Sequence, residues 1–255
     1  MPRVLHTVAE WRALRAEHRA AGRRVGFVPT MGALHSGHTS LIQAARRECA
    51  VVLVSLFVNP TQFDEPHDFD KYPRTLDTDL ALMEAAGVDV VFAPSIDEIY
   101  PNGTRYSVVE NELSRELCGA HRPGHFSGML TVVLKLLQIA DADRAYFGEK
   151  DFQQLLLVRG MCAAFFLPTE IIGCPTVRDI DGLAKSSRNA RLSSAERTLA
   201  PQFHAALVSA LSAAAARAQL EAAGFSVDYV EDRDRRRLGA VRLGHTRLID
   251  NVPLA

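Results

Sequence analysis

The sequence has 255 residues, of which 47% are hydrophobic and 23% are charged, as is ordinary for a soluble globular protein. Lys and Arg total 29 against 30 for Asp and Glu, so the formal net charge is −1, which argues against a nucleic acid or an anionic membrane as partner. We find neither a signal-peptide pattern nor an apolar run of membrane-spanning length. Four widely spaced cysteines favour buried thiols in a reducing compartment, so we expect a cytoplasmic protein.

Short apolar runs alternate with helical patterns through the first two thirds of the chain. Strands are expected at about 24–29, 51–58, 88–93, 144–147 and 170–173, and helices at about 37–48, 75–86, 129–139 and 152–166. The run at 51–58 is apolar throughout, as in a parallel strand buried on both faces. This order predicts an α/β fold with a doubly wound, Rossmann-like parallel sheet. Ligands of such sheets bind beyond the carboxyl ends of the strands.

The composition changes after about residue 175. A polar loop at 177–189 leads to an Ala-rich helical stretch at 193–223, and two strand-like pieces, 227–230 and 246–249, flank the basic run 233–237. We therefore expect a ligand-binding domain of residues 1–175 and a small α+β C-terminal lid domain of residues 176–255.

The first segment with chemical potential, residues 29–38, lies between an expected strand and an expected helix. His35 and His38 are three residues apart, so a helical turn would place both rings on one side. Gly32 and Gly37 allow the backbone to approach a ligand, and the start of a helix attracts phosphate. The alternatives are a surface turn with two histidines and a metal pair, but the usual further metal ligand is not visible nearby. The strand–loop–helix context favours phosphate binding.

Two further segments follow expected strands. Gln62 carries an amide that both donates and accepts, which suits a small hydroxy acid, although the adjacent Asn59-Pro60 alone is an ordinary turn signal. Lys150 can neutralise phosphate and Asp151 can accept from ribose hydroxyls, whereas the alternative interpretation is a solvated charged loop. Their position at the ligand edge of the sheet supports a functional role.

The fourth segment lies in the polar loop. Ser186, Ser187 and Arg188 offer two hydroxyls and a guanidinium, which could form a mobile clamp for a triphosphate. Taken alone, the segment is also typical of a Ser-rich linker between domains.

In order and spacing these segments resemble the pantothenate synthetase family. Residues 31–38 are similar to that family's version of the HxGH signature of class I nucleotidyltransferases, and residues 185–188 to its counterpart of the KMSKS loop. The resemblance runs from about residue 25 to 192 and also includes Tyr72 to Thr75, Arg122-Pro123, His125-Phe126 and Phe147 to Gln154.

The resemblance implies an ATP-dependent ligase that condenses pantoate with β-alanine through a pantoyl-adenylate, releasing AMP and pyrophosphate. It implies Mg²⁺ as a cofactor and a homodimer formed through the first domain. It places around ATP the residues Met31, Gly32, Ala33, Leu34, His35, Ser36, Gly37, His38, Gly148, Glu149, Lys150, Asp151, Val177, Lys185, Ser186, Ser187 and Arg188.

For the remaining roles, the resemblance implies that Gln62 and Gln154 hold pantoate, with Gln62 also near β-alanine, and we add Asn59 and Tyr72 as substrate-site candidates. His38 is implied as proton donor, and the expected catalytic set is His35, His38, Lys150 and Arg188. No direct metal signature is present, so Mg²⁺ is expected to enter with the ATP phosphates, with Asp79 as a candidate ligand.

The chain departs from the family pattern in two places. Lys185 stands where the family usually has Met, and we expect it to face solvent as a loop hinge rather than to contact the triphosphate. The last domain is also shorter than usual. Two rival functions stay open: another class I nucleotidyltransferase, which would not release AMP in response to β-alanine, and a non-catalytic nucleotide-binding protein, which would release no pyrophosphate.

Overall fold

The computed structural model describes residues 1–63, 69–70 and 72–254. The chain divides into two compact units. The first unit consists of Met1–Leu34, His38–Gly148 and Gln153–Cys174, and the second of His35–Gly37, Glu149–Phe152 and Pro175–Ala255. Two short segments, His35–Gly37 and Glu149–Phe152, therefore group with the C-terminal residues.

A six-stranded parallel sheet forms the centre of the first unit, which confirms the expected fold class. Its strands are β1 (Arg3–Leu5), β2 (Val25–Thr30), β3 (Val51–Leu56), β4 (Val90–Phe92), β5 (Arg144–Gly148) and β6 (Glu170–Cys174). They lie in the order β1-β4-β3-β2-β5-β6, and every pairing is parallel. The direction of winding reverses between β2 and β5, so the loops that follow these two strands leave from the switch point where such sheets bind ligands.

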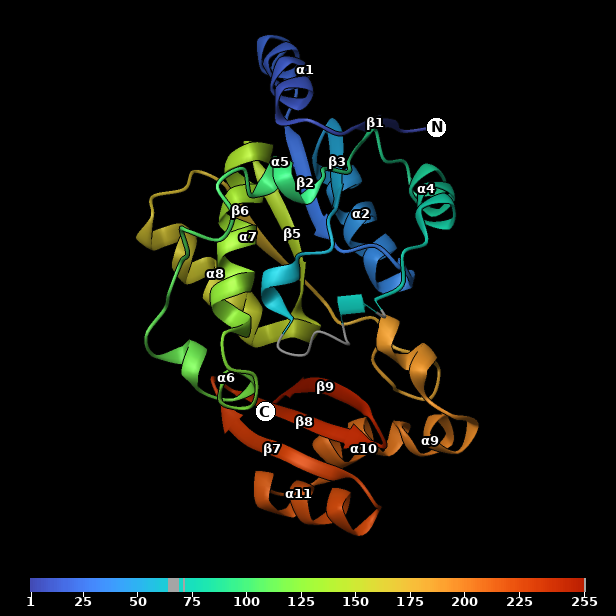
Figure 1. Cartoon of the computed structure of the whole chain (residues 1–255). Helices are drawn as coiled ribbons and strands as arrows, with labels where there is room; N and C mark the ends of the chain where they lie inside the picture. The colour runs from blue at the N-terminus through green and yellow to red at the C-terminus, as the bar shows by residue number, and fades with distance from the viewer. Residues whose placement is uncertain (64–68, 71, 255) are drawn as a thin grey trace. The chain divides into compact units, whose positions relative to one another are not determined.

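Helices lie on both sides of this sheet (Figure 1). The first unit contains α1 (Val8–Ala20), α2 (Ser36–Glu48), α4 (Leu76–Ala85), α5 (Ile96–Ile99), α6 (Cys118–His121), α7 (His125–Ala140) and α8 (Phe152–Ala164), with the short 3₁₀ turns η1 (Pro60–Gln62) and η2 (Leu113–Arg115). The turn η3 (Glu149–Asp151) belongs to the second unit. Ile42 of α2, Val54 of β3 and Met83 of α4 share one buried core. Figure 1 shows α2 and α7 on different sides of β2.

The sequence analysis gave no prediction for β1 and α1, although α1 has a clear N-terminal signal. Thr7 and Glu10 form a reciprocal capping box at its start. The indole of Trp11 is fully buried, and its Nε1 donates to the carbonyl of Ala140 at the end of α7 over 3.1 Å. This contact ties the first helix to the first unit's core.

The second unit combines helices with an antiparallel sheet. Its elements are η4 (Ser187–Arg191), α9 (Ser194–Leu199), α10 (Pro201–Ser209), α11 (Ala213–Ala222), β7 (Ser226–Arg233), β8 (Arg236–Leu243) and β9 (Thr246–Pro253). The strands lie in the order β7-β8-β9. Phe203 and Leu207 of α10, Leu220 of α11, and Val241 and Leu248 of the sheet form its core.

The prediction of two strand-like pieces in the tail was incomplete, because the basic run contains a hairpin turn and the start of β8. Asp234 and Arg235 both have positive φ, 49° and 59°, as the tight turn between β7 and β8 requires. Arg237 is buried in β8 because its guanidinium pairs with Asp232 across the hairpin over 2.7 Å. The Ala-rich stretch is also interrupted, at Pro201 and at the N-cap Ser212.

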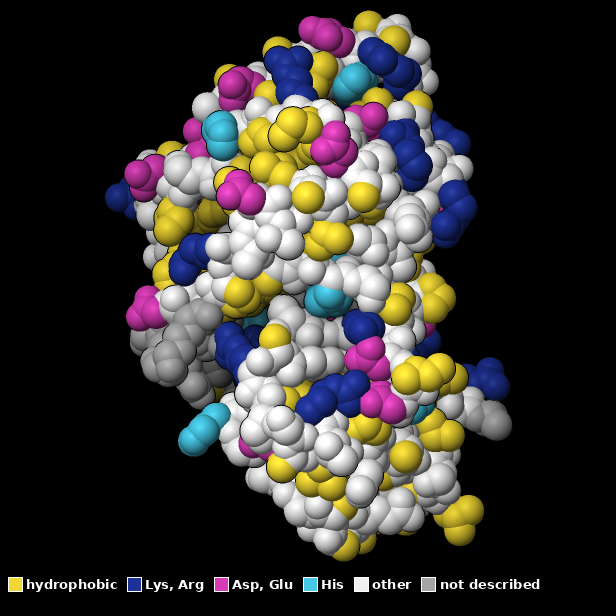
Figure 2. Space-filling view, turned by 90° about the vertical axis from the view of Figure 1, so that its right-hand side faces the viewer, with side chains coloured by type: hydrophobic (Ala, Val, Ile, Leu, Met, Phe, Trp, Pro, Cys, Tyr) yellow, Lys and Arg dark blue, Asp and Glu magenta, His cyan; other side chains and the backbone are white. Residues whose placement is uncertain are grey.

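The distribution of charged side chains on the surface agrees with the nearly equal numbers of basic and acidic residues in the sequence. On the face drawn in Figure 2, basic and acidic side chains are interspersed. The four cysteines are all buried. Within the described ranges, no helix combines the length and apolar character needed to cross a membrane.

Candidate active site

The loop that follows β2 in the first unit is held by a buried carboxylate. Asp79, at the start of α4, is only 2% exposed. One of its oxygens accepts the N–H of Ala33 over 3.0 Å, and the other accepts the N–H of Leu34 over 2.8 Å. The hydroxyl of Thr75 adds a third bond at 3.1 Å. Asp79 was a candidate Mg²⁺ ligand, but its two oxygens serve the loop backbone.

The loops after β2 and β3 meet at Gln62. Its Nε2 lies 3.0 Å from the Sδ of Met31, and its Oε1 accepts from Asn59 over 3.1 Å. Asn59 is 1% exposed and also bonds to the Tyr100 hydroxyl at 2.7 Å and to the Gly128 carbonyl at 3.2 Å. The buried Asn59 therefore orients the side-chain amide of Gln62.

Two other candidates of the first unit differ in their surroundings. Tyr72 is buried and packs edge-on against the ring of Phe63, with the ring centroids 5.7 Å apart. Gln154 is half-buried in the first turn of α8. The adjacent Gln153 is buried instead. Its side chain accepts from the Cys118 N–H at 3.0 Å and donates to the carbonyls of Leu113 and Glu116.

Two other candidates of the first unit lie at the ends of its helices and strands. A further residue, His125, was not assigned a role from the sequence. His38 lies in the first turn of α2, and Gly148 is the last residue of β5. His125, at the start of α7, places its Nδ1 2.7 Å from the carbonyl oxygen of Gln62. Its presence in a stretch that resembles the family was the available signal.

His35 belongs to the second unit and immediately precedes α2, in keeping with the helix start expected at about residue 37. Burial, together with the charges of Lys150 and Lys185, lowers the pKa of its imidazole to about 4. The ring is therefore neutral at neutral pH. A Cβ added at Gly37 would lie 2.8 Å from the Cε1 of His35, so a larger residue there would require the ring to shift.

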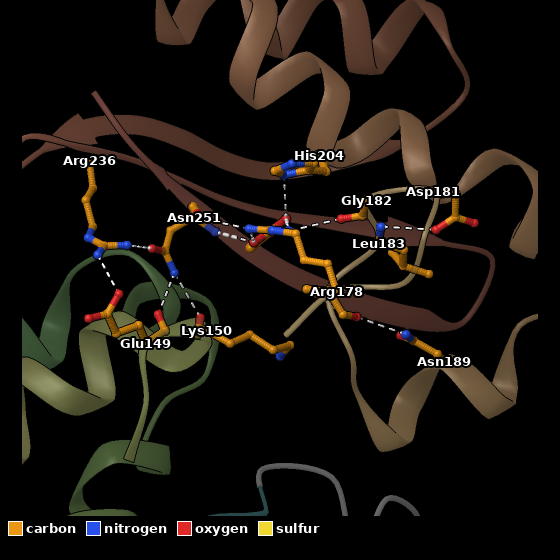
Figure 3. Close-up of polar contacts among 12 residues, drawn as sticks. Glu149, Lys150, Arg178, Asp181, Gly182, Leu183, Asn189, His204, Arg236 and Asn251 are labelled. Carbon is orange, nitrogen blue, oxygen red and sulfur yellow. Dashed lines mark hydrogen bonds and ion pairs between the residues drawn. The ribbon is translucent and has the colours of Figure 1, made fainter. Parts of the chain in front are cut away.

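Lys150 lies in the short turn η3, which the C-terminal sheet holds. Asn251 of β9 donates from Nδ2 to the carbonyls of Glu149 and Lys150, over 2.8 and 3.1 Å (Figure 3). Arg236 of β8 donates to the carboxylate of Glu149 over 2.7 Å. Lys150 Nζ itself lies 3.9 Å from the carboxylate of Asp151. Sequence reasoning placed neither Asn251 nor Arg236 near the site.

The polar loop begins as a tight hairpin between Val177 and Lys185. The N–H of Lys185 donates to the carbonyl of Val177 over 2.9 Å, and the N–H of Asp179 donates to that of Leu183 over 2.8 Å. Gly182 turns the chain with φ +90°, and a Cβ there would lie 2.8 Å from the ring of His204. The hairpin closes at Lys185, immediately before the phosphate-binding candidates Ser186, Ser187 and Arg188.

We expected Lys185 to face solvent as a loop hinge, but in the structure its side chain forms an ion pair. Its ammonium pairs with the carboxylate of Asp179, and the Lys185 side chain is 33% exposed. Arg197 of α9 shares the same carboxylate over 3.4 Å. Ser186, the next residue, caps η4 by accepting the N–H of Arg188 over 3.2 Å.

A buried carboxylate fastens this hairpin to β9. Arg178 donates to both oxygens of Asp250, over 2.6 and 2.9 Å, and to the Gly182 carbonyl over 3.1 Å (Figure 3). His204 Nδ1 lies 3.3 Å from the same carboxylate. Burial raises the pKa of Asp250, but the contacts with His204 and Arg178 outweigh it and hold that pKa below its ordinary value. Asp250 therefore stays ionised at neutral pH.

The described residues contain no group of three or more His, Cys, Asp or Glu side chains arranged to hold a metal ion. Imidazole, ammonium and hydroxyl groups instead lie on the loops that follow parallel strands. Such a fold and site define an α/β enzyme whose loops can bind nucleotide phosphates.

The chain belongs to the pantoate–β-alanine ligase family, whose model matches residues 3–253. It is an ATP-dependent ligase. The chain is 53% identical over 254 residues to the pantothenate synthetase of Bdellovibrio bacteriovorus, with 100% of each chain covered. It is 52% identical over 256 residues to that of Mycobacterium sp. strain KMS, with 92% of this chain and 82% of the relative covered. Since the Bdellovibrio relative aligns over its whole length, the short C-terminal domain is not peculiar to this chain.

Solved structures agree with this assignment. The pantothenate synthetase of Thermus thermophilus is 44% identical, with a TM-score of 0.90, covering 98% of this chain and 99% of that one. The pantoate–β-alanine ligase of Francisella tularensis, solved with β-γ ATP and β-alanine, is 40% identical, with a TM-score of 0.94, covering 99% and 98%.

Proposed function

We propose that this chain condenses pantoate with β-alanine to pantothenate through a pantoyl-adenylate, with release of AMP and pyrophosphate. The observation that carries the proposal is the grouping of His35 and Lys150 in the second unit of a chain that belongs to the pantoate–β-alanine ligase family. The Lys150 ammonium lies close enough to the imidazole of His35 to lower its pKa. Such a cluster suits a polyanionic ligand.

In the first step, the pantoate carboxylate attacks the α-phosphorus of ATP and pyrophosphate leaves. This activation is needed because a carboxylate is a poor acyl donor. Negative charge develops on the phosphate oxygens, where His35, Lys150 and Arg188 stabilise it. Ser186 and Ser187 add hydroxyl donors, and His38 is the proton donor.

The nucleotide is held by the ATP residues named from the sequence, with Val177 and Lys185 at the ends of the hairpin. The oxygens of Asp79 accept backbone N–H groups, which gives this carboxylate a structural role in the loop. Mg²⁺ would be held by the ATP phosphates, whose charge it would neutralise.

In the second step, the β-alanine amine attacks the acyl carbon and AMP leaves. Gln62 and Gln154 hold pantoate, and Gln62 also lies beside β-alanine. Asn59 supports Gln62 through its 3.1 Å hydrogen bond, and Tyr72 supports the neighbouring Phe63. Positioning dominates this step, because an amine attacking an activated acyl group needs alignment more than acid–base assistance.

The second unit acts as a lid that shields the adenylate from water. The enzyme works as a cytoplasmic homodimer associated through the first unit. The small molecules ATP, pantoate and β-alanine are its partners.

The test is pyrophosphate and AMP release, measured with ATP, pantoate and β-alanine present and with each omitted in turn. We expect pyrophosphate to require ATP and pantoate, and free AMP to require all three substrates. Pyrophosphate without pantoate would indicate another nucleotidyltransferase. ATP binding without pyrophosphate release would indicate a non-catalytic nucleotide-binding protein.

A further inference from the structure

Two consecutive residues of β9 hold two different candidate ATP-binding segments of the second unit. Asp250 accepts hydrogen bonds from both terminal nitrogens of the Arg178 guanidinium, which fastens the hairpin at the start of the polar loop. Asn251 instead donates to the turn that carries Lys150. Successive side chains of a strand point to opposite faces of the sheet. Asp250 therefore contacts the hairpin, and Asn251 contacts the turn that carries Lys150.

The amide of Asn251 is committed to this turn. It is 3% exposed, and its Nδ2 donates to the carbonyls of Glu149 and Lys150. Its Oδ1 accepts from Arg236 over 2.6 Å. Figure 3 shows Asn251 between Arg236 and the backbone of the turn. A side-chain amide has two N–H donors. In Asn251 both are used, on the carbonyls of Glu149 and Lys150, whose backbone sets the direction of the Lys150 side chain.

Arg236 supplies a second tether to the same turn. Its guanidinium donates to the Glu149 carboxylate over 2.7 Å and stacks over the Phe152 ring, 4.5 Å from the centroid. Arg236 therefore holds one side chain in the turn and another immediately after it. The turn spans only Glu149–Asp151, so it has little internal hydrogen bonding of its own to fix it.

We propose that Asn251 and Arg236 are positioning residues that aim Lys150 at the phosphates of ATP. A Lys side chain is long and flexible, so the direction of its ammonium depends on where its backbone is held. The inference rests on the role of Lys150 in the proposed function. It adds that the C-terminal sheet presents the catalytic lysine in addition to covering the ligand.

The test compares Asn251→Ala, Arg236→Gln and the control Arg242→Gln in single-turnover pyrophosphate release. Arg242 is also on β8 and pairs with Asp228 at 3.7 Å, away from the turn. We expect Asn251→Ala to slow adenylate formation about 100-fold, the typical loss for a misplaced catalytic group, with the KM for pantoate nearly unchanged. Arg236→Gln should act in the same direction, and Arg242→Gln should match the parent.

A second arm repeats Asn251→Ala in a Lys150→Ala background. If Asn251 acts through Lys150, the second substitution should have almost no further effect, because coupled residues are not additive. An equal further loss in that background would show a general structural role and overturn the inference. Should Asn251→Ala fail to fold, Arg236→Gln in both backgrounds decides.

Two results separate the inference from the proposed function. Parental rates in Asn251→Ala and Arg236→Gln, together with a slow Lys150→Ala, would overturn the inference alone. A parental rate in Lys150→Ala would contradict the proposed role of Lys150 and the inference with it.

Discussion

The backbone N–H of Gly37 donates to Nδ1 of His35 over 3.1 Å. An acceptor nitrogen carries no proton, so the neutral ring of His35 has its N–H at Nε2. In the proposed reaction, Nε2 is the ring nitrogen that can donate to a phosphate oxygen.

We predict that His35 titrates at about pH 4, as followed by NMR of its imidazole. The folded pKa is below that of the unfolded chain, so the unfolded chain binds the proton more readily. The stability that neutral His35 contributes is therefore complete above the unfolded pKa and is lost as the pH falls toward the folded value. A midpoint near the ordinary 6.5 would contradict the burial of the ring.

Gly37→Ala is expected to displace the His35 ring, because the new Cβ would lie 2.8 Å from Cε1. We expect adenylate formation to slow about 10- to 100-fold, within the range for a misplaced catalytic group. The control is Gly160→Ala in α8, where an added Cβ meets no atom within 4 Å. Equal rates in the two variants would remove His35 from the chemistry.

Asp79→Asn should lower the free energy of unfolding by about 1–3 kcal/mol, the cost of leaving buried hydrogen-bonding groups unpaired. The exposed Asp77, in the same first turn of α4, supplies the control Asp77→Asn. Thermal or urea unfolding of both variants measures the difference. If Asp79→Asn instead kept full stability and only raised the Mg²⁺ requirement, Asp79 would be a metal ligand after all.

Lys185→Met should leave ATP affinity near that of the parent, because Asp179 already pairs with the ammonium. Asp179→Asn should release the ammonium and strengthen ATP binding at low salt, an effect that about 0.15 M salt largely screens. Calorimetric titration of ATP across a salt series compares the three proteins. A screenable loss of affinity in Lys185→Met would show that Lys185 binds the triphosphate in the parent.

Gln154→Ala should raise the KM for pantoate with little change in ATP affinity, as expected for losing one hydrogen bond of about 0.5–1.5 kcal/mol. The adjacent Gln153→Ala should instead lower thermal stability, since Gln153 is buried and bonded to the Cys118 N–H and two carbonyls. Steady-state kinetics and unfolding curves of both variants separate the roles. An unchanged pantoate KM in Gln154→Ala would remove it from the substrate site.

Much of the first unit was predictable because local pattern and tertiary packing agree there. The apolar run at 51–58 became β3, shortened to Val51–Leu56, and the expected helix at 37–48 became α2. Parallel strands buried on both faces leave a strong periodic signal in the sequence. The loops after β2, β3 and β5 followed from the same pattern.

The partners of the site residues were not predictable, because they depend on long-range contacts. Asp79 was named only as a candidate Mg²⁺ ligand, yet it accepts hydrogen bonds from a loop about 45 residues earlier in the chain. Lys185 looked like a solvated hinge because nothing in the sequence pairs it with Asp179. The strand β8 was missed since Arg237 is basic and is buried only because it forms an ion pair with Asp232.

The hydrogen bond between Asn251 and Lys150 joins residues 101 positions apart. During translation at about 5–20 residues per second, the turn therefore emerges roughly 5–20 s before the strand that fixes it. Through that interval the parallel sheet can fold around β5 while the lysine lacks its anchor. The catalytic machinery is thus completed last, when the newly synthesised chain has delivered β9.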